Sequence, residues 1–163
     1  MQQITPCLWF DTQAEEAAKY YVSIFKDGTL GRIQRYGETG QDITGGKPGS
    51  VLTVEFTLNG QHFTGLNGGP LFKFSEAISL QIYCKDQEEF DYYWAKLGAG
   101  GDAKAQQCGW VKDKFGLSWQ VVPTVLIDFL QDPDKQKSER TMGAMLKMKK
   151  LDIAELKRAH DGK

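Results

Sequence analysis

The side chains best suited to chemistry gather in one short stretch, Gln107–Pro123, which reads QCGWVKDKFGLSWQVVP. An apolar run, a turn through Asp113–Gly116 and an alternating run that ends at Pro123 predict a β-hairpin. Two tryptophans, a cysteine and Gln120 lie on the strands that flank this turn. Such a mixture suits the lining of a concave pocket as well as it suits a core.

Two residues of this hairpin are candidates for catalysis. A nucleophilic cysteine needs a lowered pKa and a nearby base, and Cys108 is the best placed of the three cysteines because it adjoins the Gly109-Trp110 turn. Its simpler role, which we favour, is that of a small buried apolar residue. Asp113 could act as a general base, although an Asp in a hairpin turn usually hydrogen-bonds its own backbone. Cys7 and Cys84 lie on predicted strands and are expected in the core.

Composition excludes several classes of partner. The chain has 163 residues, with 20 basic and 21 acidic side chains and a formal net charge of -1, so we expect no nucleic acid and no anionic membrane as partner. No apolar run approaches the roughly 20 residues that cross a membrane, and the N-terminal residues do not resemble a signal peptide. Three cysteines without a CxxC pair favour free thiols and a cytoplasmic location.

The chain repeats one pattern of elements. A predicted strand at 4–10 precedes a helix over 14–25, which Asp11 or Thr12 can cap, then strands at 30–36, 51–58 and 61–66 and a glycine-rich loop at 37–50. The pattern restarts with a strand at 79–84, a helix capped by Asp86, a short strand at 103–106 and the hairpin at 108–123. Aligning the helices places Tyr20-Tyr21 over Tyr92-Tyr93, which indicates an internal duplication.

Each repeat is therefore a βαβββ unit, with boundaries at about 1–70 and 76–123 in a single domain. One such unit leaves a sheet face uncovered, so the two are expected to pair in an α+β fold. Residues 124–163 form a helical appendix with a short helix over 124–130. A second helix is predicted to start at Asp132-Pro133 and a third, capped by Asp152, to reach about Ala159.

This organisation resembles the vicinal oxygen chelate superfamily, which has the glyoxalase/bleomycin-resistance fold. Within it the chain is most similar to the PhnB-like family, which often carries the label 3-demethylubiquinone-9 3-methyltransferase. The resemblance implies a homodimer with cup-shaped sheets that enclose a pocket, and it delivers no settled reaction. The residues that carry it are Leu66-Asn67-Gly68-Gly69-Pro70, Phe72-Lys73-Phe74, Cys108-Gly109-Trp110, Lys112-Asp113, Phe115–Gln120 and Lys150–Ile153.

Metal-dependent members of that superfamily hold a divalent ion with His, Gln or Glu on the first and last strands of the units. The corresponding positions here are Ile4 or Thr5, Ser79, Leu66 or Asn67, and Gln120. Hydroxyls and amides do not make a zinc, iron or nickel site, so we expect no catalytic metal. The glycine pairs do not match G-x-G-x-x-G, and the duplicated units leave no room for a doubly wound sheet. We therefore expect no cofactor and discount methyl transfer as the mechanism.

The remaining hypothesis is a small-molecule pocket in the sheet cup. Amides would meet a polar ligand and aromatic rings would form the apolar walls, although strand alternation alone does not decide which faces line the cup. We favour a metal-free binding protein. The alternatives are an enzyme of unassigned reaction and, if the pocket is occluded, a dimer that serves only as an interaction scaffold. The residues predicted to line the pocket are Trp9, Asn67, Gln81, Tyr83, Trp110, Trp119 and Gln120.

Overall fold

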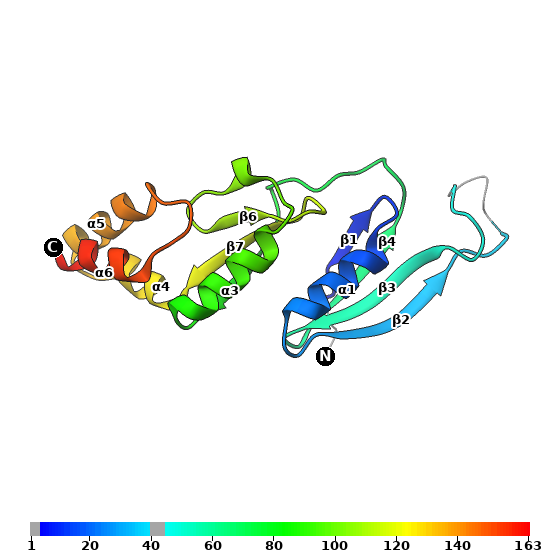
Figure 1. Cartoon of the computed structure of the whole chain (residues 1–163), viewed down its shortest axis with the longest axis horizontal. Coiled ribbons are helices and arrows are strands. Elements are labelled where there is room, and N and C mark those ends of the chain that lie inside the picture. Colours follow the sequence, from blue (N-terminus) through cyan, green and yellow to red (C-terminus); the bar gives the residue numbers. More distant parts are fainter. Residues whose placement is uncertain (1–3, 40–44) are drawn as a thin grey trace. The chain divides into compact units, whose positions relative to one another are not determined.

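The computed structural model describes residues 4–39 and 45–163, which divide into two compact units, Met1–Phe74 and Ser75–Lys163 (Figure 1). The predicted glycine-rich loop at 37–50 includes residues 40–44, which lie outside the described residues. Whether the two units together form a single domain stays a prediction. None of the helices in the described residues is long and apolar enough to span a membrane.

Unit 1 contains one helix and a four-stranded sheet with the strand order β1-β4-β3-β2. Strand β1 is parallel to β4, and the other neighbours are antiparallel. The turn between β3 and β4 has positive φ at both Asn59 (47°) and Gly60 (79°), as a two-residue hairpin requires. The elements are β1 (Cys7–Phe10), α1 (Ala14–Ile24), β2 (Thr29–Arg35), β3 (Val51–Leu58) and β4 (Gln61–Asn67).

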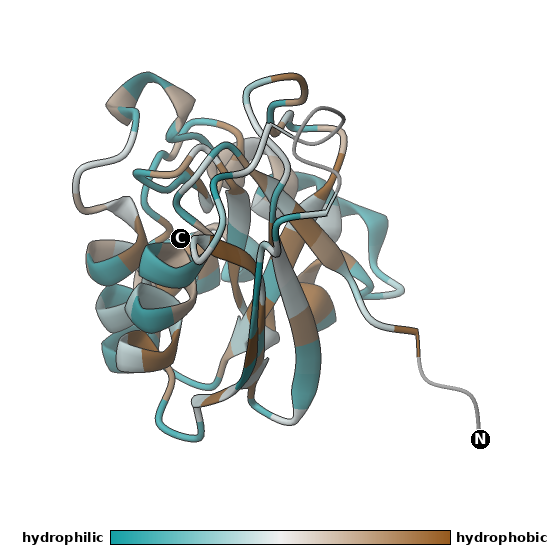
Figure 2. Cartoon of the chain, turned by 90° about the vertical axis from the view of Figure 1, so that its right-hand side faces the viewer, coloured by the Kyte–Doolittle hydropathy of each residue, from teal (hydrophilic) through white to brown (hydrophobic). Residues whose placement is uncertain are grey.

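Helix α1 covers one face of this sheet. Alternation along the strands places Leu8 and Phe10 on that face with the buried residues of β3 and β4, including a stacked Phe56–Phe63 pair at 5.2 Å. Figure 2 shows apolar and polar residues alternating along the strands. The predicted cap by Asp11 or Thr12 is wrong, because Gln13 stands at the N-cap position without a side-chain bond. Asn67, at the end of β4, instead accepts the hydrogen bond from the Ala14 N–H at 2.8 Å.

Unit 2 repeats the pattern with one strand fewer, in the order β5-β7-β6. The short strand predicted at 103–106 is a 3₁₀ turn, because the Asp102 side chain accepts a hydrogen bond from the Lys104 N–H at 2.9 Å and bends the chain locally. Tyr21 and Tyr93 are both buried, as the aligned helices require. The elements are β5 (Ser79–Cys84), α3 (Gln87–Gly98), η1 (Ala103–Ala105), β6 (Trp110–Lys112) and β7 (Ser118–Pro123).

The appendix belongs to unit 2 and contains α4 (Thr124–Leu130), α5 (Lys135–Met145) and α6 (Ile153–Asp161). The predicted helix start at Asp132-Pro133 is two residues too early, since Asp134 caps α5 through the Gln136 N–H. The predicted cap of α6 is confirmed, because Asp152 accepts from the Glu155 N–H at 2.8 Å.

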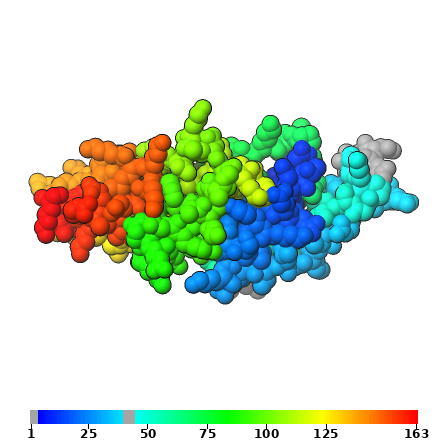
Figure 3. All heavy atoms as spheres, viewed as in Figure 1, coloured from blue at the N-terminus to red at the C-terminus, as the bar shows by residue number. Residues whose placement is uncertain are grey.

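The segment between α5 and α6, residues 146–152, crosses unit 2 as a strap. The Cys108 and Gly109 N–H groups donate to the carbonyls of Met148 and Lys149, both at 2.9 Å. From the first turn of α3, the Gln87 side chain donates to the Leu151 carbonyl and accepts from the Ile153 N–H. Figure 3 shows the orange atoms of this region against the green atoms of α3. The strap therefore fixes the turn that leads into β6.

The hairpin turn between β6 and β7 is organised by Asp113, which is only 2% exposed. Its carboxylate accepts hydrogen bonds from the Phe115 N–H (2.9 Å), the Leu117 N–H (3.1 Å) and the Trp119 indole N–H (2.8 Å). A carboxylate with this many donors and so little exposure is a structural group. Its suggested role as a general base is therefore not supported by its surroundings.

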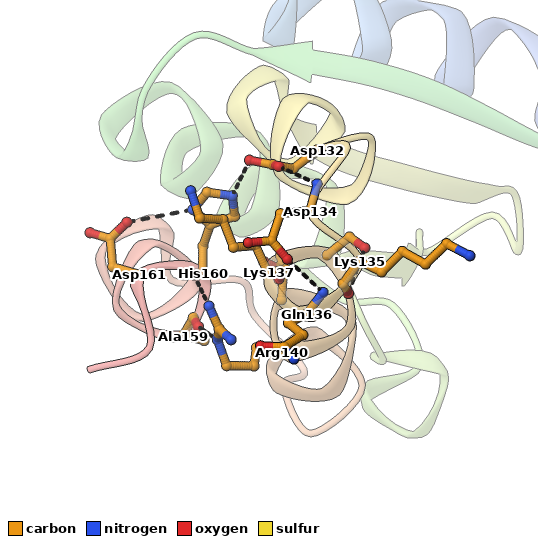
Figure 4. Close-up of polar contacts among 11 residues, drawn as sticks. Asp132, Asp134, Lys135, Gln136, Lys137, Arg140, Ala159, His160 and Asp161 are labelled. Atoms are coloured by element: carbon orange, nitrogen blue, oxygen red, sulfur yellow. Dashed lines mark hydrogen bonds and ion pairs between the residues drawn. The ribbon is translucent and has the colours of Figure 1, made fainter.

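The three appendix helices meet at His160, which is 8% exposed. Its ring stacks on Phe129 with the centroids 4.5 Å apart, and Nε2 lies 3.0 Å from a carboxylate oxygen of Asp132 (Figure 4). The Arg140 guanidinium of α5 donates to the His160 carbonyl at 2.8 Å. Hydrogen bonds, first from the Asp134 N–H and then from His160, hold the pKa of Asp132 below its ordinary value of 3.8.

This lowered pKa predicts a loss of stability in acid. A carboxyl whose folded-state pKa is depressed stabilises the fold above its unfolded-state pKa, and this stabilisation is lost as the pH falls through the folded-state value. Between about pH 6, which is above the unfolded-state pKa of an Asp, and about pH 3, which is below it, the urea midpoint of unfolding should fall further for the native chain than for Asp132→Asn. Asp128→Asn, on the exposed side of α4, is the matched control and should follow the native chain. Parallel curves for all three proteins would contradict the role of Asp132.

The hairpin turn gives a second prediction. Asp113→Ala leaves three donors without their acceptor, so the free energy of unfolding should fall by about 3 kcal/mol, with a smaller loss for Asp113→Asn. Urea denaturation followed by tryptophan fluorescence measures both values. The exposed control Asp128→Ala should change stability by less than about 0.5 kcal/mol. A loss for Asp113→Ala as small as that of the control would refute the structural role.

Candidate ligand-binding face

The sheet of unit 2 has one face that α3 does not cover, and the polar candidates of the sequence analysis lie there. The pairing register places Gln81 of β5 opposite Gln120 of β7, and Gln120 opposite Trp110 of β6. Directly paired residues project to the same side of a sheet, so these three side chains form one row across it. Ser79 and Tyr83, two residues either side of Gln81, share this side. We call these five residues the amide face.

A continuous chain of hydrogen bonds joins the polar side chains of the amide face. The Tyr83 hydroxyl donates to Gln81 Oε1 at 2.9 Å, and Gln81 Nε2 donates to Gln120 Oε1 at 3.3 Å. Gln120 Nε2 then donates to Ser79 Oγ at 2.7 Å. Gln81 and Tyr83 are exposed and Gln120 is half-buried, so the row lies at the surface of the unit. Each amide is thus oriented before any ligand arrives.

The next row on the same side contains a charged residue, Lys112, whose charge is balanced by an ion pair. Lys112 of β6 pairs in register with Ser118, and its ammonium forms an ion pair with Glu76. This pair holds the pKa of Glu76 below its ordinary value, mainly through the hydrogen bond from Lys112. The amide face is therefore bordered by a neutral ion pair and contains no charged residue of its own.

The opposite side of the sheet faces the core, and one predicted pocket residue, Trp119, lies on that side. Trp119 is 2% exposed and donates its indole N–H to Asp113, so it does not belong to the amide face. Cys84 is also buried, as expected, and burial raises the pKa of its thiol to about 12. A thiol with that pKa is protonated at neutral pH and is a poor nucleophile.

Two predicted pocket residues belong to unit 1. Trp9 lies on the helix-free side of that sheet, where its ring touches the Phe72 ring edge-on at 4.9 Å and its indole N–H donates to the Gly69 carbonyl. Cys7 shares this side and is exposed, so its predicted place in the core is wrong. Cys7 faces away from α1, because it alternates with the buried Leu8.

Asn67 has a structural role and also borders a separate cavity. Its side chain accepts from the Ala14 N–H and donates to the Val51 carbonyl at 3.0 Å, and its own carbonyl accepts from the Tyr36 hydroxyl at 2.5 Å. These bonds tie the ends of β2, β3 and β4 to the start of α1. The cavity beside them measures about 490 Å³ and is also lined by Asp11, Thr12, Glu15, Lys47 and Ser50. The Asn67 amide thus joins these elements with one donor and one acceptor bond, and its predicted contact with a ligand stays a prediction.

Cys108 occupies a strained position beside the amide face. Its φ is 49°, which is unusual for a residue with a side chain, and it is half-buried. Gln107 donates its amide to the Cys108 sulfur at 3.4 Å and to the Leu146 carbonyl at 3.0 Å. The thiol is thus part of the contact between the hairpin and the strap.

The residues named as metal positions are only partly brought together. Ser79 and Gln120 meet directly, whereas Ile4 lies before β1 and is 93% exposed. Within residues 4–39 and 45–163, no three His, Cys, Asp or Glu side chains are grouped so that they could hold a metal ion. The amide and hydroxyl donors of the amide face have the chemistry of a neutral polar site.

Sequence reasoning considered Ser79 only as a metal position and overlooked it as part of the polar row. The signal was its spacing, because residues two apart on a strand share a side, and Ser79, Gln81 and Tyr83 alternate with Leu80, Ile82 and Cys84. The partner strand could not be registered from the sequence alone, so the contact with Gln120 remained hidden.

Comparison with known proteins identifies the family. The family model described as 3-demethylubiquinone-9 3-methyltransferase matches residues 2–122. A structure named putative 3-demethylubiquinone-9 3-methyltransferase, PhnB protein, from Bacillus cereus is 36% identical, with a TM-score of 0.63, and the match covers 76% of this chain and all of that one. No functionally curated protein is similar enough to match.

Two more distant structures are similar. A protein from Pseudomonas aeruginosa is 18% identical with a TM-score of 0.57, over 76% of this chain and 98% of that one, which concerns the fold alone. A glyoxylase/bleomycin resistance protein/dioxygenase domain from Frankia sp. EAN1pec is 13% identical with a TM-score of 0.48, over 76% of this chain and 92% of that one. The predicted α+β fold with C-terminal helices is confirmed. The chain belongs to the PhnB-like family that carries the 3-demethylubiquinone-9 3-methyltransferase label.

Proposed function

We propose that this chain is a small-molecule-binding protein that works without a metal ion, and that its ligand contacts the amide face. The observation that carries the proposal is the hydrogen-bonded row Tyr83–Gln81–Gln120–Ser79 beside the half-buried Trp110. Oriented amides next to an aromatic side chain are typical of sites that recognise small organic molecules.

The pattern of engaged and free groups favours binding over catalysis. Asp113 is saturated by donors from its own turn, and the Cys84 thiol has a pKa of about 12. The amide face itself offers no titratable carboxylate or imidazole to serve as a general base, which acid–base catalysis requires. The methyltransferase label is likewise unsupported by these residues, because none of the glycine pairs opens a nucleotide-binding helix.

Two further expectations remain proposals. We propose that the protein is a homodimer, as the family resemblance implies, and that it is cytoplasmic, as its unpaired cysteines suggest. Sedimentation equilibrium of the purified chain tests the first, and a mass of one chain at micromolar concentration would contradict it. Trp9, on the helix-free side of unit 1, is likewise proposed to contact the ligand.

The metal-free part of the proposal has a direct test. Protein purified without chelator or affinity tag, then incubated with excess zinc, nickel or manganese and dialysed, should hold well below about 0.1 ion per chain, because amides and hydroxyls bind these ions weakly. Elemental analysis measures the content. One tightly held ion per chain would overturn the proposal and would favour the enzyme of unassigned reaction.

Binding at the amide face is tested with Nile red, an uncharged aromatic dye whose fluorescence rises when it leaves water. We expect the fluorescence to rise and saturate as dye is added. Trp110→Ala should lower the affinity for the dye about tenfold, since a buried aromatic contact contributes about 1–2 kcal/mol. The matched control is Trp94→Ala, which removes the other half-buried tryptophan of unit 2, stacked on Phe90 in α3.

The result that would contradict the proposal is equal affinity in the native chain and Trp110→Ala, or no saturable signal at all. If a compound that binds is instead consumed, and Gln120→Ala or Cys108→Ala abolishes its turnover while the fold stays intact, the chain is an enzyme.

A further inference from the structure

The direction of the hydrogen bonds on the amide face defines which ligand chemistry can satisfy it, provided that the proposed binding function holds. Every bond in the row uses one donor and one acceptor: Tyr83 to Gln81, Gln81 to Gln120, and Gln120 to Ser79. Each glutamine carboxamide has a second N–H, and the Ser79 hydroxyl accepts without yet donating. The row therefore still has three donors to offer: the second N–H of Gln81, the second N–H of Gln120 and the O–H of Ser79.

These donors need acceptors whenever water is removed from the face. A ligand that covers a donor without accepting from it leaves a polar group unsatisfied, which costs more than the hydrogen bond itself contributes. Apolar ligands should therefore bind weakly at this row, whereas ligands with carbonyl oxygens should bind more tightly. Gln81 and Gln120 lie on neighbouring strands, roughly 4.8 Å apart, and their amides touch at 3.3 Å, so a fused bicyclic ring can cover both.

The charges around the row argue against an ionic ligand. Among the residues that the pairing register places on this side, Lys112 is the one charged side chain, and it is already paired with Glu76. Recognition of phosphate or carboxylate groups normally uses an unpaired Arg or Lys. An organic cation would need a carboxylate or an open aromatic cage. The amide face contains no carboxylate and has three unused hydrogen-bond donors instead.

Aromatic rings stand at both ends of the polar row. Trp110 lies on β6, directly paired with Gln120, and Tyr83 lies on β5 with its ring more than half exposed at 53%. Planar ligands gain contact with such rings at little conformational cost. The strap holds the Trp110 end in place through the Cys108 and Gly109 N–H groups.

We propose that the amide face selects uncharged, planar aromatic compounds that carry carbonyl oxygens, and that Gln81, Gln120 and Ser79 are the residues that read these oxygens. Aromatic lactones, quinones and cyclic imides have this chemistry.

Four bicyclic probes of similar size separate the alternatives: 7-methoxycoumarin (uncharged, with a carbonyl), 2-methoxynaphthalene (uncharged, without one), naphthalene-2-sulfonate (anion) and N-methylquinolinium (cation). Equilibrium dialysis against the full chain gives the dissociation constant of each. We expect 7-methoxycoumarin to bind at least about tenfold more tightly than the other three, the effect of one or two hydrogen bonds.

Variants of the row identify the responsible groups. Gln120→Leu should weaken the binding of 7-methoxycoumarin by about tenfold, because it removes a donor that only the coumarin uses. The binding of 2-methoxynaphthalene should stay the same or become tighter. Gln120→Glu should also weaken the binding of the coumarin. Its carboxylate should shift the preference towards the cation N-methylquinolinium. Gln81→Leu is the second variant, in case one of these substitutions disturbs folding, and Gln136→Leu on the exposed side of α5 is the matched control. Circular dichroism and urea midpoints confirm that each variant is folded.

The outcomes distinguish this inference from the proposed function. If any of the other three probes binds as tightly as 7-methoxycoumarin, or if Gln120→Leu and Gln81→Leu both bind it as well as the native chain does, the selection by carbonyl oxygens is wrong and the binding function stands. If no probe binds more tightly than about 1 mM and Nile red also gives no saturable signal, both the inference and the proposed function fail.

Discussion

The pairing register of β5 with β7 is the constraint on which the candidate site depends. It sets Gln81 opposite Gln120 and, through β6, Gln120 opposite Trp110, so that one side of the sheet carries the polar row while Trp119 and Val121 enter the core. A slip by one residue would turn the tryptophan outward and bury the glutamine, exchanging the two faces completely. Two interactions prevent it: Trp119 is held by Asp113 across the hairpin turn, and Ser79 is held by Gln120 across the strands.

The residues that identify the family mostly secure the fold around that register. Gly109 has a φ of 84°, and a Cβ there would lie 2.7 Å from the Val121 carbonyl oxygen, so the turn that receives the strap requires glycine. Leu151, at the end of the strap, is 1% exposed, and Asp152 caps α6. In unit 1, Gly68 lies directly against the Trp9 ring, and Phe74 contacts Phe10 edge-on. These motifs therefore predict a shared architecture, and a reaction does not follow from them.

The sequence predicted most of the fold because its signals are local. The strand alternation at β3, the Asn59-Gly60 turn and the cap by Asp86 each depend on residues a few positions apart, and all are present. Some errors arose where a distant residue decides, whereas the 3₁₀ turn at 103–105 and the start of α5 reflect local caps, by Asp102 and Asp134, that were overlooked. Asn67 caps α1 from 53 residues away, and the apolar first strand did not reveal that Cys7 lies on the face opposite α1. The site was half predictable for the same reason: the polar and aromatic residues were recognisable, but their faces depend on pairing between strands about 40 residues apart.

The amide face also explains how an uncharged site can be selective without being reactive. Its amides are already oriented by one another, so a ligand finds them in place and the entropy of ordering two long side chains is not lost again on binding. The groups left over include three donors, and each one that a mismatched ligand covers costs about 1–3 kcal/mol. Three such donors can separate a carbonyl-bearing ligand from an apolar one of equal size by a large factor, although the contact area is the same. Selectivity here arises from a penalty on the wrong ligand, and this requires neither a metal ion nor a titrating group.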